Sequence, residues 1–241
     1  MNWTLLYIIA GILLLPMFLY GLFAQANIQN VFRRYLEYPS KANITSSELA
    51  KALLLRADIK DVEVVPIKGH LDDCYDPKRK VIKISMEAYN LTSIAALGVA
   101  AHEVGHAVQH HNKSFLFRLR NAIVPVVNLV SKMYIPLVLA GSILSFTFMI
   151  PAVGFWICWG SVIAYGASLL FYLITLPLEF DASKKAIQMM RETEAFSETE
   201  LKQAKHVLNA AAQTYIATSL TQLIYFLRFL SYAMIFSDNK K

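Results

Sequence analysis

Charged residues are scarce in this sequence and are absent from two long stretches. Only 17% of the 241 residues are charged, whereas about a quarter are charged in an ordinary soluble domain. No Asp, Glu, Lys, Arg or His occurs from Met1 to Phe32, or in the 46 residues from Met133 to Leu178. An uncharged run of 46 residues is longer than a buried helix of a soluble protein requires. The composition therefore predicts that these stretches lie in a lipid bilayer.

The uncharged stretches are long enough for three membrane crossings. A helix needs about 20 apolar residues to cross the hydrocarbon core. The first stretch fits one crossing, Trp3 to Phe23. The second fits two, Tyr134–Ile150 and Phe155–Leu176, with a turn expected at Pro151 and Gly154.

The N-terminal segment, residues 1–26, has a second interpretation. Ala24-Gln25-Ala26 has the form of a signal-peptidase cleavage site. However, the segment lacks a basic start and its apolar run exceeds the usual 7–15 residues. These features favour a retained transmembrane helix over a cleaved signal peptide.

The C-terminal segment, residues 207–241, is apolar as far as Leu227 but carries a polar stripe. The stripe consists of Asn209, Gln213, Thr214, Thr218 and Gln222. A fourth crossing and a helix lying in the interface both fit this pattern. The fold class expected is therefore a mostly α membrane protein with three or four transmembrane helices.

The net charge of +6 does not indicate a nucleic-acid-binding protein. The basic residues gather beside the apolar segments, as the positive-inside rule predicts for cytoplasmic flanks. They are Arg33, Arg34, Lys113, Arg118, Arg120, Lys184, Lys185 and Arg191. No interleaving of aromatic and basic residues suggests a platform for single strands. We expect a multi-pass protein of the cell membrane whose aqueous parts face the cytoplasm.

Disulfide bonds are not expected. The only cysteines are Cys74, in an aqueous segment, and Cys158, inside a predicted crossing. A cysteine in an aqueous segment and one inside the membrane are not expected to form a disulfide bond. No CxxC metal motif occurs.

The first aqueous segment, residues 27–132, has a mixed α+β pattern. Thr45-Ser46-Ser47-Glu48 is a capping box that predicts a helix to about Asp58. Val62–Val65 and Val81–Ile84 predict strands separated by a loop over Lys68–Lys80. Ser93 to about His111 predicts a helix of small apolar residues.

The second aqueous segment, residues 177–206, lies between the crossing pair of residues 133–176 and the C-terminal apolar helix. Pro177 is expected to open a new helix. Ser197-Glu198-Thr199-Glu200 is another capping box, which predicts the start of the last helix.

A metal-binding motif lies inside the predicted helix Ser93–His111. His102-Glu103-Val104-Gly105-His106 is an HExxH sequence, and its i, i+4 spacing puts both imidazoles on one helix face, where they can share one Zn²⁺. Glu103 is then placed to act as the general base towards water. Burying these polar side chains among Ala, Val and Gly is costly unless a metal pairs with them.

The third ligand is predicted to be Glu179. Residues that share a metal must emerge on the same side of the membrane, and two predicted crossings separate His106 from Glu179. Asp181 and Glu87 remain alternatives. The metzincin pattern would need a glycine and a histidine where Gln109 and Asn112 stand, so that class is excluded.

The other histidines are not predicted ligands. His110 lies about 12 Å along the helix axis from His102, too far to share its ion. His111 is also expected outside the site, and His70 and His206 have no partner at ligand spacing.

The combined motifs resemble the YugP-like family of neutral zinc metallopeptidases of bacterial membranes. The resemblance rests on Tyr75-Asp76-Pro77, Ala100 to Gln109, Leu176 to Phe180, Ala182 and Ser183. It implies peptide-bond hydrolysis, one zinc ion per chain and a small zincin-like cytoplasmic part. The family usually has His where this chain has Cys74.

The chain is also distantly similar to HtpX-type membrane gluzincin proteases. In these, the third ligand is a Glu followed by Ala three residues later and Asp four residues later. Ala182 fits this pattern relative to Glu179, whereas Ser183 replaces the Asp.

The sequence therefore predicts a membrane-embedded zinc endopeptidase that acts on peptides or proteins. The strand Val81–Ile84 is expected to hold an extended peptide by edge addition. One alternative is a structural or sensing zinc protein without catalysis. Another is a transporter, which the lack of buried charge in the crossings disfavours.

Overall fold

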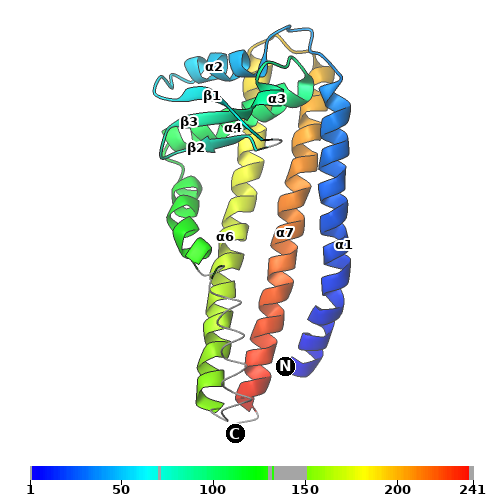
Figure 1. Ribbon diagram of the computed structural model, residues 1–241, viewed down its shortest axis with the longest axis vertical. Coiled ribbons are helices and arrows are strands. Elements are labelled where there is room, and N and C mark those ends of the chain that lie inside the picture. Colours follow the sequence, from blue (N-terminus) through cyan, green and yellow to red (C-terminus); the bar gives the residue numbers. More distant parts are fainter. Residues whose placement is uncertain (1, 70–71, 130–131, 133–150, 239–241) are drawn as a thin grey trace. The chain divides into compact units, whose positions relative to one another are not determined.

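The computed structural model describes residues 2–69, 72–129, 132 and 151–238. It is mostly helical with one small sheet (Figure 1). The chain forms two compact units. One comprises Met1–Phe23, Leu119–Leu176 and Tyr215–Lys241, and the other comprises Ala24–Arg118 and Pro177–Thr214. The second unit is called the site-bearing unit below, and the first the apolar unit.

The helices are long at both ends of the chain and short in between. They are α1 (Trp3–Leu36), α2 (Ser46–Arg56), α3 (Met86–Tyr89), α4 (Ile94–His111), a helix over residues 115–129, α6 (Pro151–Glu192) and α7 (Glu198–Asp238).

The predicted helix starts in the site-bearing unit are confirmed. Thr45 caps α2 through a reciprocal capping box with Glu48. Ser93 caps α4 by accepting a hydrogen bond from the backbone N–H of Ala96. Ser197 and Glu200 form the second capping box, at the start of α7. Each of these caps involves residues only three positions apart, so the sequence alone is enough to predict it.

α6 begins at Pro151, where a turn was expected, and runs without interruption to Glu192, so the breaks predicted at Gly154 and Pro177 are wrong. Pro151 takes the first helical position, where its missing N–H costs nothing, and Gly154 is helical. Pro177 lies inside the helix instead of opening a new one. Its loss of one hydrogen bond is offset by burial of the residues that follow, including Leu178 and Met190. The predicted crossing Tyr134–Ile150 lies outside the described residues.

The sheet has three strands, β1 (Glu63–Ile67), β2 (Cys74–Asp76) and β3 (Val81–Ser85), in the order β1-β3-β2. β1 pairs in parallel with β3, and β2 pairs antiparallel to it. The two predicted strands are confirmed, whereas β2 was predicted as loop. Because β3 is the central strand, it has no free edge, and the prediction that it holds a peptide by edge addition is wrong.

The core of the site-bearing unit joins α2, β3, α4, α6 and α7. Its fully buried members include Leu53, Ile82, Leu97, Val104 and Met190. The α4 side of this core consists largely of Ala and Gly. Small side chains let neighbouring helices approach α4 closely, and this closeness positions the polar residues described below.

Among the described residues, two helices are long and apolar enough to cross a membrane. They are α1 and the part of α6 from Phe155 to Glu192. In its most apolar window, α1 is only 6% buried. A signal sequence passes the same test of length and composition, so this finding alone does not choose between the two interpretations of the N-terminus.

Candidate metal centre

Helix α4 approaches α6 closely at Gly105. A Cβ atom built on Gly105 would lie 2.6 Å from the backbone oxygen of Ala182. Such contacts do not occur between real atoms, so only glycine fits here without moving a backbone. This close approach brings the HExxH side chains of α4 against the α6 turn that begins at Glu179.

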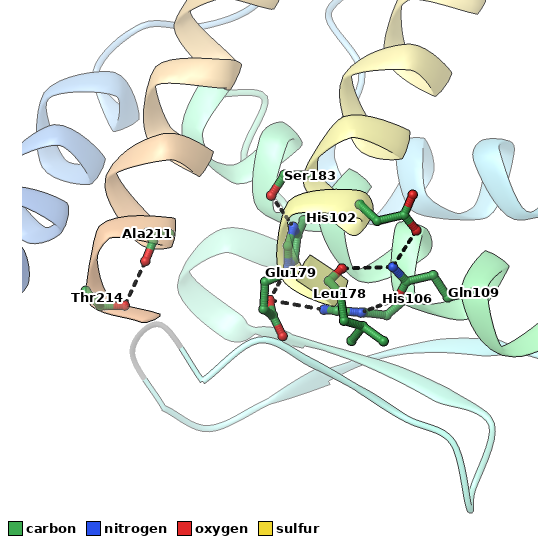
Figure 2. A network of polar contacts seen from close by, with 9 residues as sticks. His102, His106, Gln109, Leu178, Glu179, Ser183, Ala211 and Thr214 are labelled. Atoms are coloured by element: carbon green, nitrogen blue, oxygen red, sulfur yellow. Dashed lines mark hydrogen bonds and ion pairs between the residues drawn. The ribbon is translucent and has the colours of Figure 1, made fainter. Parts of the chain in front are cut away.

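Three predicted ligands converge at this contact (Figure 2). Glu179 Oε2 lies 3.2 Å from His102 Nε2 and 3.5 Å from His106 Nε2. The donor atoms of all three residues lie within 4.8 Å of one another. Donors at 2.0–2.2 Å from a tetrahedral zinc are separated by about 3.4 Å. The two nitrogens and one carboxylate oxygen therefore fit Zn²⁺ in identity and spacing.

The orientation of His106 is fixed by a chain of hydrogen bonds (Figure 2). Gln109 Nε2 donates to the Leu178 carbonyl at 2.9 Å and to Asp181 Oδ2 at 2.8 Å. Both partners accept only, so the amide oxygen of Gln109 must face the other way, towards His106 Nδ1 at 3.0 Å. His106 Nδ1 then carries the proton, and in the neutral ring the lone pair of Nε2 faces Glu179.

Two lone pairs facing each other at this distance repel unless a cation lies between them or the imidazole is protonated. Gln109 thus favours the tautomer that a metal ligand requires. Figure 2 shows the hydrogen bonds that link Gln109 to His106 and to Leu178. This role was not predicted from the sequence. The available signal was a glutamine three residues after His106, on the same helix face.

His102 has a corresponding partner in Ser183. Ser183 Oγ lies 3.1 Å from His102 Nδ1. This is the position where HtpX-type proteases carry Asp. The hydroxyl keeps a hydrogen bond to the outer nitrogen but adds no negative charge behind the ring.

Glu103 is buried beside this cluster, with 7% of its surface exposed. Burial raises the pKa of Glu103, while the neighbouring charges of His106 and His102 lower it in part. The pKa of His106 is also raised. Burial, the largest influence, lowers it, but the hydrogen bond to Glu179 and the charge of Glu103 outweigh that effect. A buried carboxylate with a raised pKa is suited to accept and return a proton near neutral pH.

The rival ligands lie outside the cluster. The carboxylate of Asp181 binds Gln109 and Lys185, and Glu87 is exposed on the short helix α3. His110 accepts or donates a 2.7 Å hydrogen bond with the hydroxyl of Tyr75, and His206 lies 3.2 Å from the hydroxyl of Tyr35. His111 is exposed, and His70 lies outside the described residues.

Cys74 is the first residue of the edge strand β2, and it is exposed. Partial burial of its sulfur and the charge of Glu103 raise the pKa of the Cys74 thiol. The thiol is therefore protonated at neutral pH and not activated as a nucleophile.

Comparison with known proteins assigns the chain to a family. Residues 10–234 match the model of the family described as "Putative neutral zinc metallopeptidase". The chain belongs to this family. It is 36% identical over 217 residues to "Putative membrane protease YugP" of Bacillus subtilis (strain 168), which covers 90% of this chain and 92% of that protein. No solved structure matches the chain.

Proposed function

We propose that this protein is a membrane-embedded zinc endopeptidase, with His102, His106 and Glu179 as the metal ligands and Glu103 as the general base. The observation that carries the proposal is the convergence of the three donor atoms, together with the Gln109 hydrogen bonds that turn the lone pair of His106 Nε2 towards Glu179. Membership of the zinc metallopeptidase family supports the same reaction. The helix α4, the sheet and the Glu179 segment would form a zincin-like aqueous part.

The reaction assigned to these residues is the hydrolysis of a peptide bond. Zinc, when bound, supplies a Lewis acid that acidifies water and polarises the scissile carbonyl. The Glu103 carboxylate takes the proton of the attacking water. It then donates that proton to the nitrogen of the leaving amine, so that the water is divided between the two products.

The substrate is proposed to be an extended peptide paired with the outer edge of β2. β2 is an edge strand of the sheet and packs against α4. Besides partial burial, the charge of Glu103 raises the pKa of the thiol of Cys74, the first residue of β2. Strand addition there would carry a peptide past the proposed base through backbone hydrogen bonds.

Three or four transmembrane helices are proposed, with the aqueous parts, residues 27–132 and 177–206, on the cytoplasmic face. The name of the Bacillus relative and the two candidate membrane helices support a membrane location. The basic flanks support the orientation.

Orientation is tested by placing a cysteine at Lys51, an exposed residue of α2, in a chain with Cys74→Ser and Cys158→Ser. We expect a membrane-impermeant maleimide to label this cysteine only after the cells are permeabilised. Labelling of intact cells would show that the orientation is inverted.

The proposed catalysis is tested by Glu103→Gln. The amide cannot accept the proton but leaves the three ligands in place, so zinc content should stay near one per chain. The turnover of a casein-derived peptide should fall by about 10²–10⁴-fold. His102→Ala is the control that should lose both zinc and activity.

Full activity of Glu103→Gln would remove Glu103 from the mechanism. Zinc retention with no peptidase activity in the wild type would favour the alternative, a structural or sensing zinc protein. Against that alternative stands the buried carboxylate of Glu103, which a purely structural site does not need.

A further inference from the structure

A cavity on the site-bearing unit combines an apolar floor with a basic rim. It has a volume of about 680 Å³ and lies between α6 and α7. The apolar part is formed by Phe180, Ile187, Leu201 and Leu208. Leu201 and Leu208 are almost fully buried, whereas Phe180 is 44% exposed. One wall thus offers an apolar surface that is open to a ligand.

The basic rim carries four cations and one carboxylate. Arg191 and Glu198 neutralise each other through a paired contact, with both nitrogen–oxygen distances at 3.1 Å. The remaining cations are Lys184, Lys202 and Lys205, all exposed. Among the described residues, none of these three lysines forms an ion pair, so the cavity has an uncompensated positive charge.

The position of the cavity in the sequence indicates where its ligand comes from. Phe180 follows the apolar segment Phe155–Leu176 by four residues, and Leu208 lies at the start of the apolar stretch of α7. Basic residues within about 15–20 residues of a membrane segment lie near the lipid headgroups. Each such residue attracts an anionic membrane surface by about 1 kcal/mol.

We propose that this cavity binds the headgroup of an anionic phospholipid. Lys184, Lys202 and Lys205 contact the phosphate, and the lipid's glycerol and upper acyl carbons lie against the exposed face of Phe180. An anionic amphiphile matches both the rim and the floor, whereas free phosphate uses only the rim. The proposal rests on the membrane location proposed above, but not on catalysis.

The cavity also borders the metal centre through one residue. Ser183 lines the cavity, and its hydroxyl lies 3.1 Å from His102 Nδ1. A lipid bound there lies against the residue that orients one proposed ligand. The lipid site is nevertheless separable from zinc binding, because none of the three lysines is part of the cluster of His102, His106 and Glu179.

The test is a lipid titration of the purified full-length protein in detergent, followed by native mass spectrometry. The probes are dioleoyl-phosphatidylglycerol and the zwitterionic dioleoyl-phosphatidylcholine. We expect tight binding of one phosphatidylglycerol and weak binding of phosphatidylcholine. The triple variant Lys184→Gln, Lys202→Gln, Lys205→Gln should bind phosphatidylglycerol at least tenfold more weakly.

A matched control removes the same charge elsewhere. Lys51, Lys60 and Lys78 are exposed lysines outside the cavity, and changing all three to Gln should alter the affinity less than twofold. The double variant Lys202→Gln, Lys205→Gln should give an intermediate loss, with helix content checked by circular dichroism. Zinc content should stay at the wild-type level in all of these variants, which separates this test from that of the metal centre.

Four results would overturn the proposal. One is wild-type affinity in the cavity variant, and another is an equal loss in the matched control, which would indicate general charge attraction. The third is displacement of the lipid by millimolar inorganic phosphate, which would identify a phosphate site. The fourth is stronger binding of a poly-glutamate peptide than of the lipid, which would identify an acidic protein segment as the occupant.

Discussion

Helices α1 and α4 are both rich in apolar residues but use them in opposite ways. α1 carries large side chains that are not packed into the protein core, such as Ile12, Leu15 and Phe18, which are 60–67% exposed. α4 carries mainly Ala, Gly and Val, most of them fully buried. Large exposed side chains fit a surrounding of lipid, whereas small buried ones allow the close helix contact that a polar site requires.

The difference between α1 and α4 predicts where single substitutions should have the largest effects. On α1, an apolar side chain needs only an apolar surrounding, and many shapes meet that need. On α4, Gly105 faces the backbone of Ala182, and His106 is linked through Gln109 to the Leu178 carbonyl of α6. We therefore expect single substitutions at the α4–α6 contact to have large effects, and those on the exposed face of α1 to have small ones.

The largest effect is expected for Glu179→Ala. The variant removes the only proposed ligand that α6 supplies, and the two histidines alone hold zinc poorly. Zinc measured by mass spectrometry after dialysis should fall from about one per chain to near zero. Peptidase activity should be lost with it.

Two variants on the same network provide graded controls. Gln109→Leu removes the hydrogen bond that orients His106 and should weaken zinc binding about 10–100-fold. Asp181→Ala should retain zinc, because the Leu178 carbonyl still accepts a hydrogen bond from Gln109. Loss of zinc from Asp181→Ala together with full zinc in Glu179→Ala would contradict the ligand assignment.

Gly105→Ala should destabilise the site-bearing unit by about 1–3 kcal/mol, as expected for overpacking. The new methyl group would press on the backbone oxygen of Ala182, which cannot turn aside as a side chain does. The midpoint of thermal unfolding, followed by circular dichroism with zinc present, should fall accordingly.

Two controls make this test specific to the close contact. Gly98→Ala places its Cβ 3.4 Å from the Cβ of Ala204, close to an ordinary contact, so it should be neutral or stabilising. Leu15→Ile, on the exposed face of α1, should change stability by less than about 0.5 kcal/mol. A similar loss for Gly98→Ala and Gly105→Ala would show that the contact with Ala182 is not limiting.

A smaller, pH-dependent effect is expected at Glu200. Its carboxylate accepts hydrogen bonds from the hydroxyl and backbone N–H of Ser197, the backbone N–H of Lys41 and the hydroxyl of Ser40. Burial raises the pKa of Glu200, but these bonds outweigh it and lower the pKa to about 2. Because the folded pKa lies below the unfolded value of about 4.3, the stabilisation is complete above that value and is lost as the pH falls towards 2.

Glu200→Gln should therefore be less stable than the wild type at pH 7, by about 3 kcal/mol at most. The difference should shrink between pH 4.5 and pH 3, because the wild type loses its advantage there. Thermal unfolding of both proteins across this range is the measurement. A difference that does not change with pH would show that the charge of Glu200 contributes nothing.

The sequence predicts the local parts of this fold well. Caps, the HExxH helix and two strands depend on neighbouring residues, and the structure confirms them. β2 was missed because its three residues, Cys74 to Asp76, lie in a stretch rich in Gly, Asp and Pro, and only pairing with β3 makes them a strand. The breaks at Gly154 and Pro177 were wrong because helix propensity was overridden by the rest of the chain.

In the candidate site, too, some residues could be predicted from the sequence and others could not. The pair His102 and His106 follows from spacing within one helix. Glu179 was chosen from membrane topology, and the structure brings it to both histidines. The roles of Gln109 and Gly105 depend on which residues of α6 face α4, and no pattern within α4 alone contains that information.

Because Glu179 lies 73 positions after His106, zinc bound at this site would close a long loop. The entropy cost of closing a flexible loop grows only with the logarithm of its length, by about 0.6 kcal/mol for each doubling. Lengthening a flexible part of the intervening segment would therefore carry little penalty to the metal site. What the site does require is the register of one α6 turn, the turn that begins at Glu179, against α4.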